Sequence, residues 1–468
     1  MKKIINLAFE KYIILLFLTL YAIFINYIYD LADYKLVADA SSYLYFSFEN
    51  LNVFFSQHRS FLFPLILNTY VYLTGMPFGE STNFFGYFNF FLFLFSVWFL
   101  YITLVKLDFS KFLCGFLVYG ILLTYNFYIY FTYMNTDVIG LSFFFLSLGS
   151  FLNYVHTDKK LSLIMFSLLI FCCILIRSSY IVTVPCFLFY FYRFNKITLN
   201  KKVIFKYISF IFTSNILIVL FVIIRLIYTG HLGLVSFTGV LASNHLTFLA
   251  EIEDVEKVSI KNRDFIRGLI ERRDVNMTGQ CSISYDEAVR KKKKIHRHRA
   301  SCYNNYLMAA WLENIKHNNN YEPFPSDDER NHEAWNHTNL SGFFNLKDNN
   351  DIDQQLMSST REIILLNPTE YLNIVIQAAL KGSLFNYVIG IKYLILLFIV
   401  GNILMYILFK KINISKKEIV FFELNLIHFF MLTILTCFMN FPEERFFICQ
   451  LIILLPSLSF YILSKYKN

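Results

Sequence analysis

The chain has 468 residues, of which 56% are hydrophobic and 19% aromatic, and its mean hydropathy is +0.50. With only 8 prolines and a formal charge of +9 at pH 7, this composition excludes an ordinary soluble globular domain and predicts an all-α polytopic membrane protein. The charged residues lie mainly in short links between long Phe-, Leu- and Ile-rich segments, so their distribution predicts the membrane topology.

The apolar segments predict about ten transmembrane helices, since roughly 20 residues cross a hydrocarbon core. In chain order they are residues 12–29, 84–105, 112–131, 138–155, 162–176, 180–192, 207–228, 387–409, 419–439 and 446–463. The first is long and lacks a small-residue cleavage site, so we interpret it as an uncleaved span and not a signal peptide. The fifth and sixth are short, and we expect a tight hairpin or a re-entrant pair that turns at Arg177.

Every second connection between the apolar segments is basic. The basic residues are Lys2, Lys3, Lys106, Lys111, Lys159, Lys160, those of the runs 193–206 and 410–417, Lys465 and Lys467. The positive-inside rule therefore places both termini in the cytoplasm of a multi-pass protein of the plasma or inner membrane.

The other connections carry Asp, Glu and Arg on the extracytoplasmic face. They are the first external loop (30–83), the turns at 135–137 and at Arg177, an insert at 230–385, and the link 440–445. An ionisable group at the membrane edge costs on the order of 2–3 kcal/mol unless it is solvated or paired. Such groups at several adjacent turns indicate one shared polar cavity.

The first external loop contains the densest set of candidate site residues. Asp39 precedes an amphipathic stretch, and His58 and Arg59 precede Pro64 and an apolar segment that comes too early to be the next span. This pattern is typical of two interfacial helices that lie along the membrane.

The insert divides the chain into an N-terminal transmembrane module (1–229), a small, mainly helical extracytoplasmic region (230–385) and a C-terminal transmembrane module (386–468). Cys281 and Cys302 form a disulfide only if that face is oxidising, which the sequence leaves open. The basic run 291–299 is either a solvated surface or a patch for lipid phosphates or an anionic glycan. Nucleic acid is not an expected partner on this face, and no metal-binding spacing of Cys and His occurs.

The order of the external motifs resembles the GT-C superfamily of polytopic glycosyltransferases, which includes protein mannosyltransferases and lipid A aminoarabinose transferases. In that superfamily an Asp in the first external loop is followed by a Ser-Tyr-Leu-like element and then by an Arg with a Pro-Leu segment. The corresponding residues are Asp39, Ser42-Tyr43-Leu44, Arg59 and Pro64-Leu65, followed in order by Asn135-Thr136-Asp137, Arg177, Asn367-Pro368 and Glu444-Arg445. Unlike many members, the chain has no acidic neighbour beside Asp39 and no soluble domain after residue 463.

The resemblance implies transfer of a sugar from a polyprenyl-phosphate-linked donor to an acceptor outside the cytoplasm, for which we expect a glycan or a lipid. An attacking acceptor hydroxyl must lose a proton, and we assign Asp39 as its base. Fixed cations stabilise the departing phosphate, and Arg59, Arg177, Arg445 and His58 are the candidates. Asp137 would orient the acceptor or a cationic side chain, and Glu444 would support Arg445. A divalent cation stays an open alternative as cofactor.

Structural roles compete with each of these assignments. Asp39 would be a helix N-cap, Asp137 and Glu444 members of ion pairs, His58 a packing residue, and the arginines contacts to lipid headgroups. Two other functions remain open, an O-antigen-type polymerase and, less favoured, a lipid or polysaccharide transporter. A transporter would place ionisable groups at mid-membrane, where Arg225 and Glu423 are among the few charged residues.

Overall fold

The computed structural model describes residues 10–28, 31, 43, 46–57, 59–75, 85–122, 131–134, 136–195, 201–235, 239, 242, 245–246, 249–276, 349–377, 379, 415–439 and 461. Within these residues, five helices are long and apolar enough to cross a membrane, which confirms a helical membrane protein. They are α2 (Lys11–Ile28), α6 (Phe85–Lys106), α8 (Asp137–Thr157), α11 (Lys201–Thr229) and α21 (Lys416–Met439). The predicted span 387–409 lies outside the described residues, as does 446–463 apart from Tyr461.

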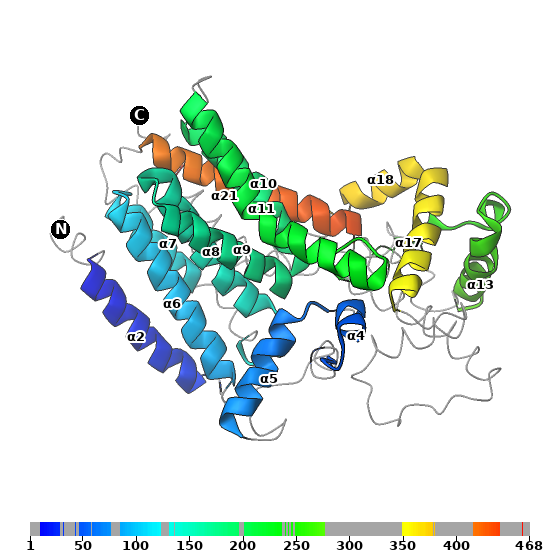
Figure 1. Ribbon diagram of the computed structural model, residues 1–468, viewed down its shortest axis with the longest axis horizontal. Helices are drawn as coiled ribbons and strands as arrows, with labels where there is room; N and C mark the ends of the chain where they lie inside the picture. The colour runs from blue at the N-terminus through cyan, green and yellow to red at the C-terminus, as the bar shows by residue number, and fades with distance from the viewer. Residues whose placement is uncertain are drawn as a thin grey trace.

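Helix α8 is the central helix of the bundle, packed between α6 and α9 (Lys160–Ile176) (Figure 1). Small residues along α8 allow this approach, as at Gly149, where an added Cβ would lie 2.7 Å from the ring of Phe99. The hydroxyls of Ser142 and Ser147 donate to carbonyls of their own helix, at 2.9 and 2.8 Å. These two hydroxyls are thus satisfied within α8, while the apolar side chains of the helix form the core.

The two short apolar segments form a helical hairpin that turns at Arg177, as predicted. After α9 the chain passes through η3 (Ser178–Val182) into α10 (Thr183–Asn195). His156 Nε2 near the end of α8 lies 3.1 Å from Tyr190 Oη of α10, so α10 returns to the end of the bundle from which α9 began. At 1.5 Å per residue, the 13 residues of α10 span roughly 20 Å.

The parts of the predicted basic links that the structure describes lie together at one end of the bundle, which we call the basic end; Lys2, Lys3, residues 196–200 and 410–414, Lys465 and Lys467 lie outside the described residues. Their contacts are Lys111 to Glu10, the backbone N–H of Ser110 to Glu418, Lys417 to the carbonyl of Leu107, Lys206 to Asp158, and Arg193 to Glu423. Links that the positive-inside rule assigns to one side therefore share one end of the structure. We call the other end, where α8 begins and α9 stops, the opposite end.

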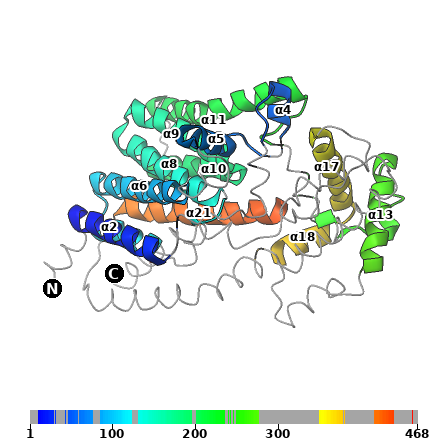
Figure 2. The ribbon, with the colours of Figure 1, turned by 90° about the horizontal axis from the view of Figure 1, so that it is seen from below.

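The described parts of the insert are mainly helical, as predicted. They comprise η4 (Ile252–Asp254), α13 (Ile260–Asn276), α17 (Asn349–Leu366) and α18 (Pro368–Gln377), and the three α-helices lie on the side of the bundle opposite α2 (Figures 1 and 2). Their apolar core includes Leu249, Ile266 and Ile363. The hydroxyl of Ser359 donates to Asn262 Oδ1 at 3.0 Å in the seam between α17 and α13.

Helix α18 begins at Pro368, as the Asn367-Pro368 pair predicts, because proline is well suited to the first helical position. The hydroxyl of Tyr371 donates to the carbonyl of Phe438 at 2.7 Å, near the end of α21. Burial raises the pKa of this phenol to about 12, so it stays protonated as a donor at neutral pH. The insert is thereby attached to the C-terminal end of α21.

Candidate functional site

Asp137 and Arg177 form a buried ion pair at the opposite end of the bundle. Asp137 is the first residue of α8, where the helix dipole favours a carboxylate, and Arg177 is the C-terminal cap of α9. Their side chains are 3% and 12% exposed, respectively. The sequence suggested these two residues from separate turns, and the structure brings them into contact.

Gly140 makes this contact possible. A Cβ at Gly140 would lie 3.2 Å from Cε2 of Tyr180 and 3.8 Å from Cβ of Arg177. The thiol of Cys173 also donates to the carbonyl of Gly140, at 3.4 Å. The absent side chain therefore lets the turn after α9 rest directly on the first turn of α8, within reach of Asp137.

Arg59 comes from the first external loop, between the short helix α4 (Leu51–Ser56) and α5 (Leu62–Thr74). Its guanidinium carbon lies 5.2 Å from the centroid of the Tyr43 ring, a cation–π contact. Tyr43 in turn meets Phe63 edge to face, with 4.8 Å between ring centroids. Two helices of 6 and 13 residues are present in this loop, and both are shorter than the five long apolar helices. Their position along the membrane stays a prediction.

One apolar cluster connects Arg59 to the buried ion pair. Its buried members are Tyr43, Phe63, Leu67, Phe85, Met134, Ile139 and Ile176. Ile139 follows Asp137 by two residues, and Ile176 immediately precedes Arg177. Three of the predicted site residues thus occupy the same end of the bundle, away from the basic links.

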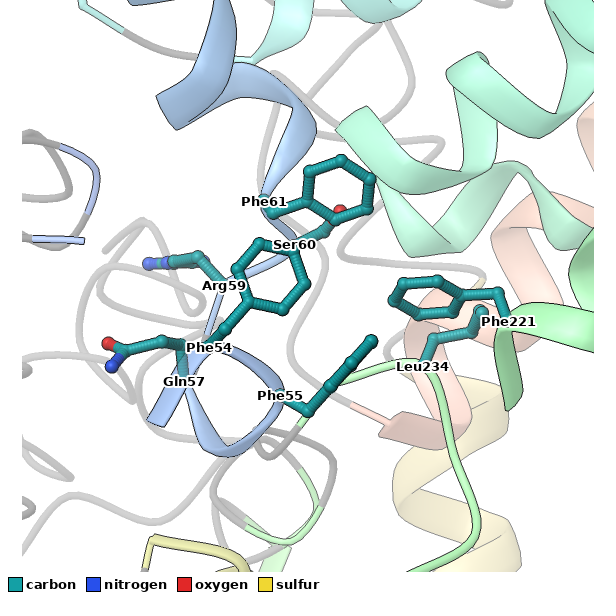
Figure 3. Close-up of a pocket in the computed structure, with 8 residues that line it drawn as sticks. All are labelled: Phe54, Phe55, Gln57, Arg59, Ser60, Phe61, Phe221 and Leu234. Carbon is teal, nitrogen blue, oxygen red and sulfur yellow. The ribbon is translucent and has the colours of Figure 1, made fainter. Parts of the chain in front are cut away.

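The side chain of Arg59 extends away from α11, in the same direction as Gln57 (Figure 3). An arginine guanidinium carries N–H donors whose geometry suits oxyanions. The arrangement can therefore bind a phosphate or carboxylate group at the surface of the first external loop.

The remaining predicted site residues, Asp39, His58, Glu444 and Arg445, lie outside the described residues. Within the part of the chain that the structure describes, no group of three His, Cys, Asp or Glu side chains is arranged to hold a metal ion.

Arg225 is a structural residue whose role the sequence did not reveal. It is 2% exposed in α11, and it donates to the carbonyls of Phe55, His231 and Gly233 at 3.1, 3.2 and 3.3 Å. It therefore joins the first external loop to the chain that leaves α11 for the insert. A single arginine in the apolar run 207–228 was the available signal, but its backbone partners are distant in sequence.

Glu423, a second charged residue in a predicted span, accepts from Nε of Arg193 at 3.2 Å, at the basic end. Both charged groups that would have favoured a transporter thus have partners near the ends of the spans.

Comparison of the chain with protein-family models, curated proteins and solved structures gives no match.

Proposed function

We propose that the chain is an integral membrane glycosyltransferase that moves a sugar from a polyprenyl-phosphate-linked donor to an extracytoplasmic glycan or lipid. The observation that carries this proposal is the position of Arg59, Asp137 and Arg177 at one end of a bundle whose basic links lie at the other. The positive-inside rule makes the basic end cytoplasmic and the charged opposite end extracytoplasmic. The protein would then lie in the plasma or inner membrane with both termini inside.

In the proposed reaction an acceptor oxygen attacks the anomeric carbon, and the bond from that carbon to the phosphate oxygen breaks with inversion. Asp39 accepts the proton of the acceptor hydroxyl, and polyprenyl phosphate leaves. The negative charge on the leaving phosphate is stabilised by Arg59, together with Arg445 and His58.

Asp137 acts as a positioning residue in this scheme. Since its carboxylate is already engaged with Arg177 in a buried site, it is not available as a base, and it fixes the direction of the guanidinium. Arg177 supports the phosphate site from the end of α9. This assignment selects the cation-orienting role for Asp137 over the acceptor-orienting one.

The test compares sugar transfer in membranes that contain the wild-type chain, Asp39→Asn, Arg59→Gln or Arg193→Gln at matched amounts. Arg193 is a suitable control because it is a half-exposed arginine at the basic end. We expect Asp39→Asn to lower the rate on the order of 10²–10⁴-fold, the typical contribution of a general base. Arg59→Gln is expected to be strongly impaired and Arg193→Gln to remain near wild type.

Full transfer by Asp39→Asn would remove that residue from the mechanism. Addition of many repeat units from lipid-linked oligosaccharides, in place of one sugar, would identify the polymerase. Movement of the lipid-linked sugar across the membrane without transfer would identify a transporter.

A further inference from the structure

Helix α18 of the insert lies against the end of α21 that is far from the basic end (Figures 1 and 2). The hydroxyl of Tyr371 donates to the carbonyl of Phe438 at 2.7 Å, and the two rings meet edge to face with 5.9 Å between their centroids. One turn further along α18, Val375 is 5% exposed and packs with the fully buried Cys437. One face of α18 is therefore fixed to the last turn of a helix that is long and apolar enough to cross the membrane.

The last turn of α21 lies at a membrane edge. The 24 residues of α21 span roughly 36 Å at 1.5 Å per residue, slightly more than the thickness of a hydrocarbon core. The first turn of α21 lies at the basic end, where Glu418 accepts from the backbone N–H of Ser110 at 2.8 Å. Since the basic end lies at one membrane surface, the turn that holds α18 lies at the other.

A second side of α18 is apolar and exposed. Pro368, Leu372 and Ile376 recur every four residues, so they form one stripe along the helix. The side chains of Leu372 and Ile376 are 49% and 46% exposed. At about 100° per residue, this stripe borders the face that holds Val375, whereas the exposed Glu370 lies on the opposite side of the helix. The apolar sector of α18 therefore extends beyond its contact with α21.

An exposed apolar stripe of α21 reaches α18. Phe430, Ile434 and Phe438 recur every four residues along α21 and are 50%, 46% and 39% exposed. Large apolar side chains in such positions on a membrane helix face lipid, because their exposure to water would be unfavourable. Phe438 is the last member of this stripe and also contacts Tyr371. The lipid-facing surface of α21 thus runs directly up to α18.

The start of α18 is held in a fixed direction. The side-chain amide of Asn367 donates to Oδ2 of the buried Asp254 at 2.8 Å. Asp254 belongs to η4, so this bond ties the corner between α17 and α18 to a separate segment of the insert. A surface that is already ordered binds without the entropic cost of ordering it.

We propose that Leu372 and Ile376 enter the leaflet opposite the basic end and contact lipid acyl chains there, so that α18 anchors the insert to the membrane surface. An amphipathic helix binds at the boundary of headgroups and acyl chains through the apolar area that it buries. The opposite side of α18, with Glu370, then faces water. The sequence placed the whole of residues 230–385 outside the membrane, whereas this contact brings part of α18 into the bilayer. The contact does not depend on sugar transfer.

The test uses the full chain in nanodiscs of phosphatidylcholine and phosphatidylglycerol. The photoreactive residue p-benzoylphenylalanine replaces Leu372, Ile376 or Glu370 in separate variants, and all three positions are exposed enough to accept a larger side chain. After irradiation, mass spectrometry of the digested protein identifies the molecule that each position contacts. We expect adducts with lipid acyl chains at positions 372 and 376 and their loss at position 370, the matched control on the other side of the same helix.

The same replacement of Ile434, on the exposed stripe of α21, is the positive control for lipid contact. Lipid adducts at 434 without any at 372 and 376, in folded protein, would show that the stripe of α18 lies in water. Equal yields of lipid adducts at 370 and 372 would show that α18 has no membrane-facing side. Adducts with peptides of a second, isotope-labelled copy, or of another segment of the same chain, would identify a protein partner instead. Each of these three results would overturn the proposal.

Discussion

The two ends of the bundle hold ion pairs of different kinds. At the basic end, Lys111 and Glu10 meet at 2.6 Å with side chains that are 54% and 44% exposed. At the opposite end, Asp137 and Arg177 are paired with almost no exposure. An exposed pair contributes about 0–1 kcal/mol, whereas removal of one partner from a buried pair costs about 3–5 kcal/mol. The same chemical contact therefore has different consequences at the two ends.

The difference indicates what each pair is for. Exposed pairs at the basic end can be lost without leaving a charge in an apolar environment, and they suit links whose main role is to set topology. A buried pair contributes little net stability over an apolar replacement of the same shape, so its presence calls for another reason. Positioning of Arg177 for chemistry is the reason that the proposed function supplies.

The largest expected effect is that of Arg177→Leu, which leaves the carboxylate of Asp137 buried beside an apolar side chain. We expect a loss of about 3–5 kcal/mol in stability together with loss of sugar transfer. Thermal unfolding of the purified protein in detergent, followed by transfer assays in membranes, measures both. An unchanged unfolding temperature would show that Asp137 is adequately solvated without Arg177.

The double variant Asp137→Asn/Arg177→Gln separates stability from chemistry. Because it removes both charges together, it should regain most of the stability that Arg177→Leu loses. Transfer should remain defective, since the guanidinium is still absent. Recovery of transfer along with stability would mean that the pair is structural only.

The next effect in size is that of Gly140→Val, at the contact between α8 and the turn after α9. The new side chain would collide with Tyr180 and push Arg177 away from Asp137. We expect a loss of about 1–3 kcal/mol, as for overpacking in a core. Gly268→Val is the matched control for helix propensity, because nothing lies within 4 Å of an added Cβ in that helix of the insert. An equal loss in both variants would assign the effect to propensity and not to the contact.

The sequence predicted much of the fold because membrane spans are governed by length, apolar composition and the position of basic links. Apolar runs located α2, α6, α8, α11 and α21, and the Arg177 turn was visible as an interruption between two short runs. Spacing in the chain could not show that Asp137 reaches Arg177, since that contact depends on the missing side chain of Gly140 and on helix packing.

The role of Arg225 was hidden from the sequence for a related reason. Its partners are backbone carbonyls, which every residue carries, so no residue type marks them. The contacts among aromatic rings, such as that of Phe55 with Phe221, were equally unpredictable, because aromatic residues are frequent along the whole chain and only the fold shows which of them face one another.

Glu362, a carboxylate of the insert, accepts hydrogen bonds from Ser259, and its contribution to stability is expected to lie between those of the ion pairs at the two ends of the bundle. Burial acts to raise its pKa, but hydrogen bonds from the backbone and hydroxyl of Ser259 and from Asn262 outweigh it, so the pKa lies below its ordinary value. A lowered pKa in the folded state gives stability that is present above the unfolded-state pKa, about 4.3, and is lost as the pH falls through the folded-state value. We therefore expect the wild type to protect α13 and α17 from amide exchange better than Glu362→Gln at pH 7.

That difference should vanish once the pH lies below the lowered pKa of the folded state, where Glu362 itself is protonated. Comparison at the same pH cancels the intrinsic pH dependence of exchange. A difference of the same size at both pH values would show that the hydrogen bonds to Ser259 do not depend on the charge.

The smallest expected effect is that of Lys111→Met at the basic end. The substitution removes the partner of Glu10, but both side chains are about half exposed, so water replaces the lost contact. We expect a change of about 0–1 kcal/mol in unfolding free energy and unchanged sugar transfer. High salt should reduce the effect further, because exposed charges are screened. A loss of stability as large as that of Arg177→Leu would contradict the contrast between the two ends. It would mean that the unpaired carboxylate of Glu10 destabilises the folded state as much as a buried charge does.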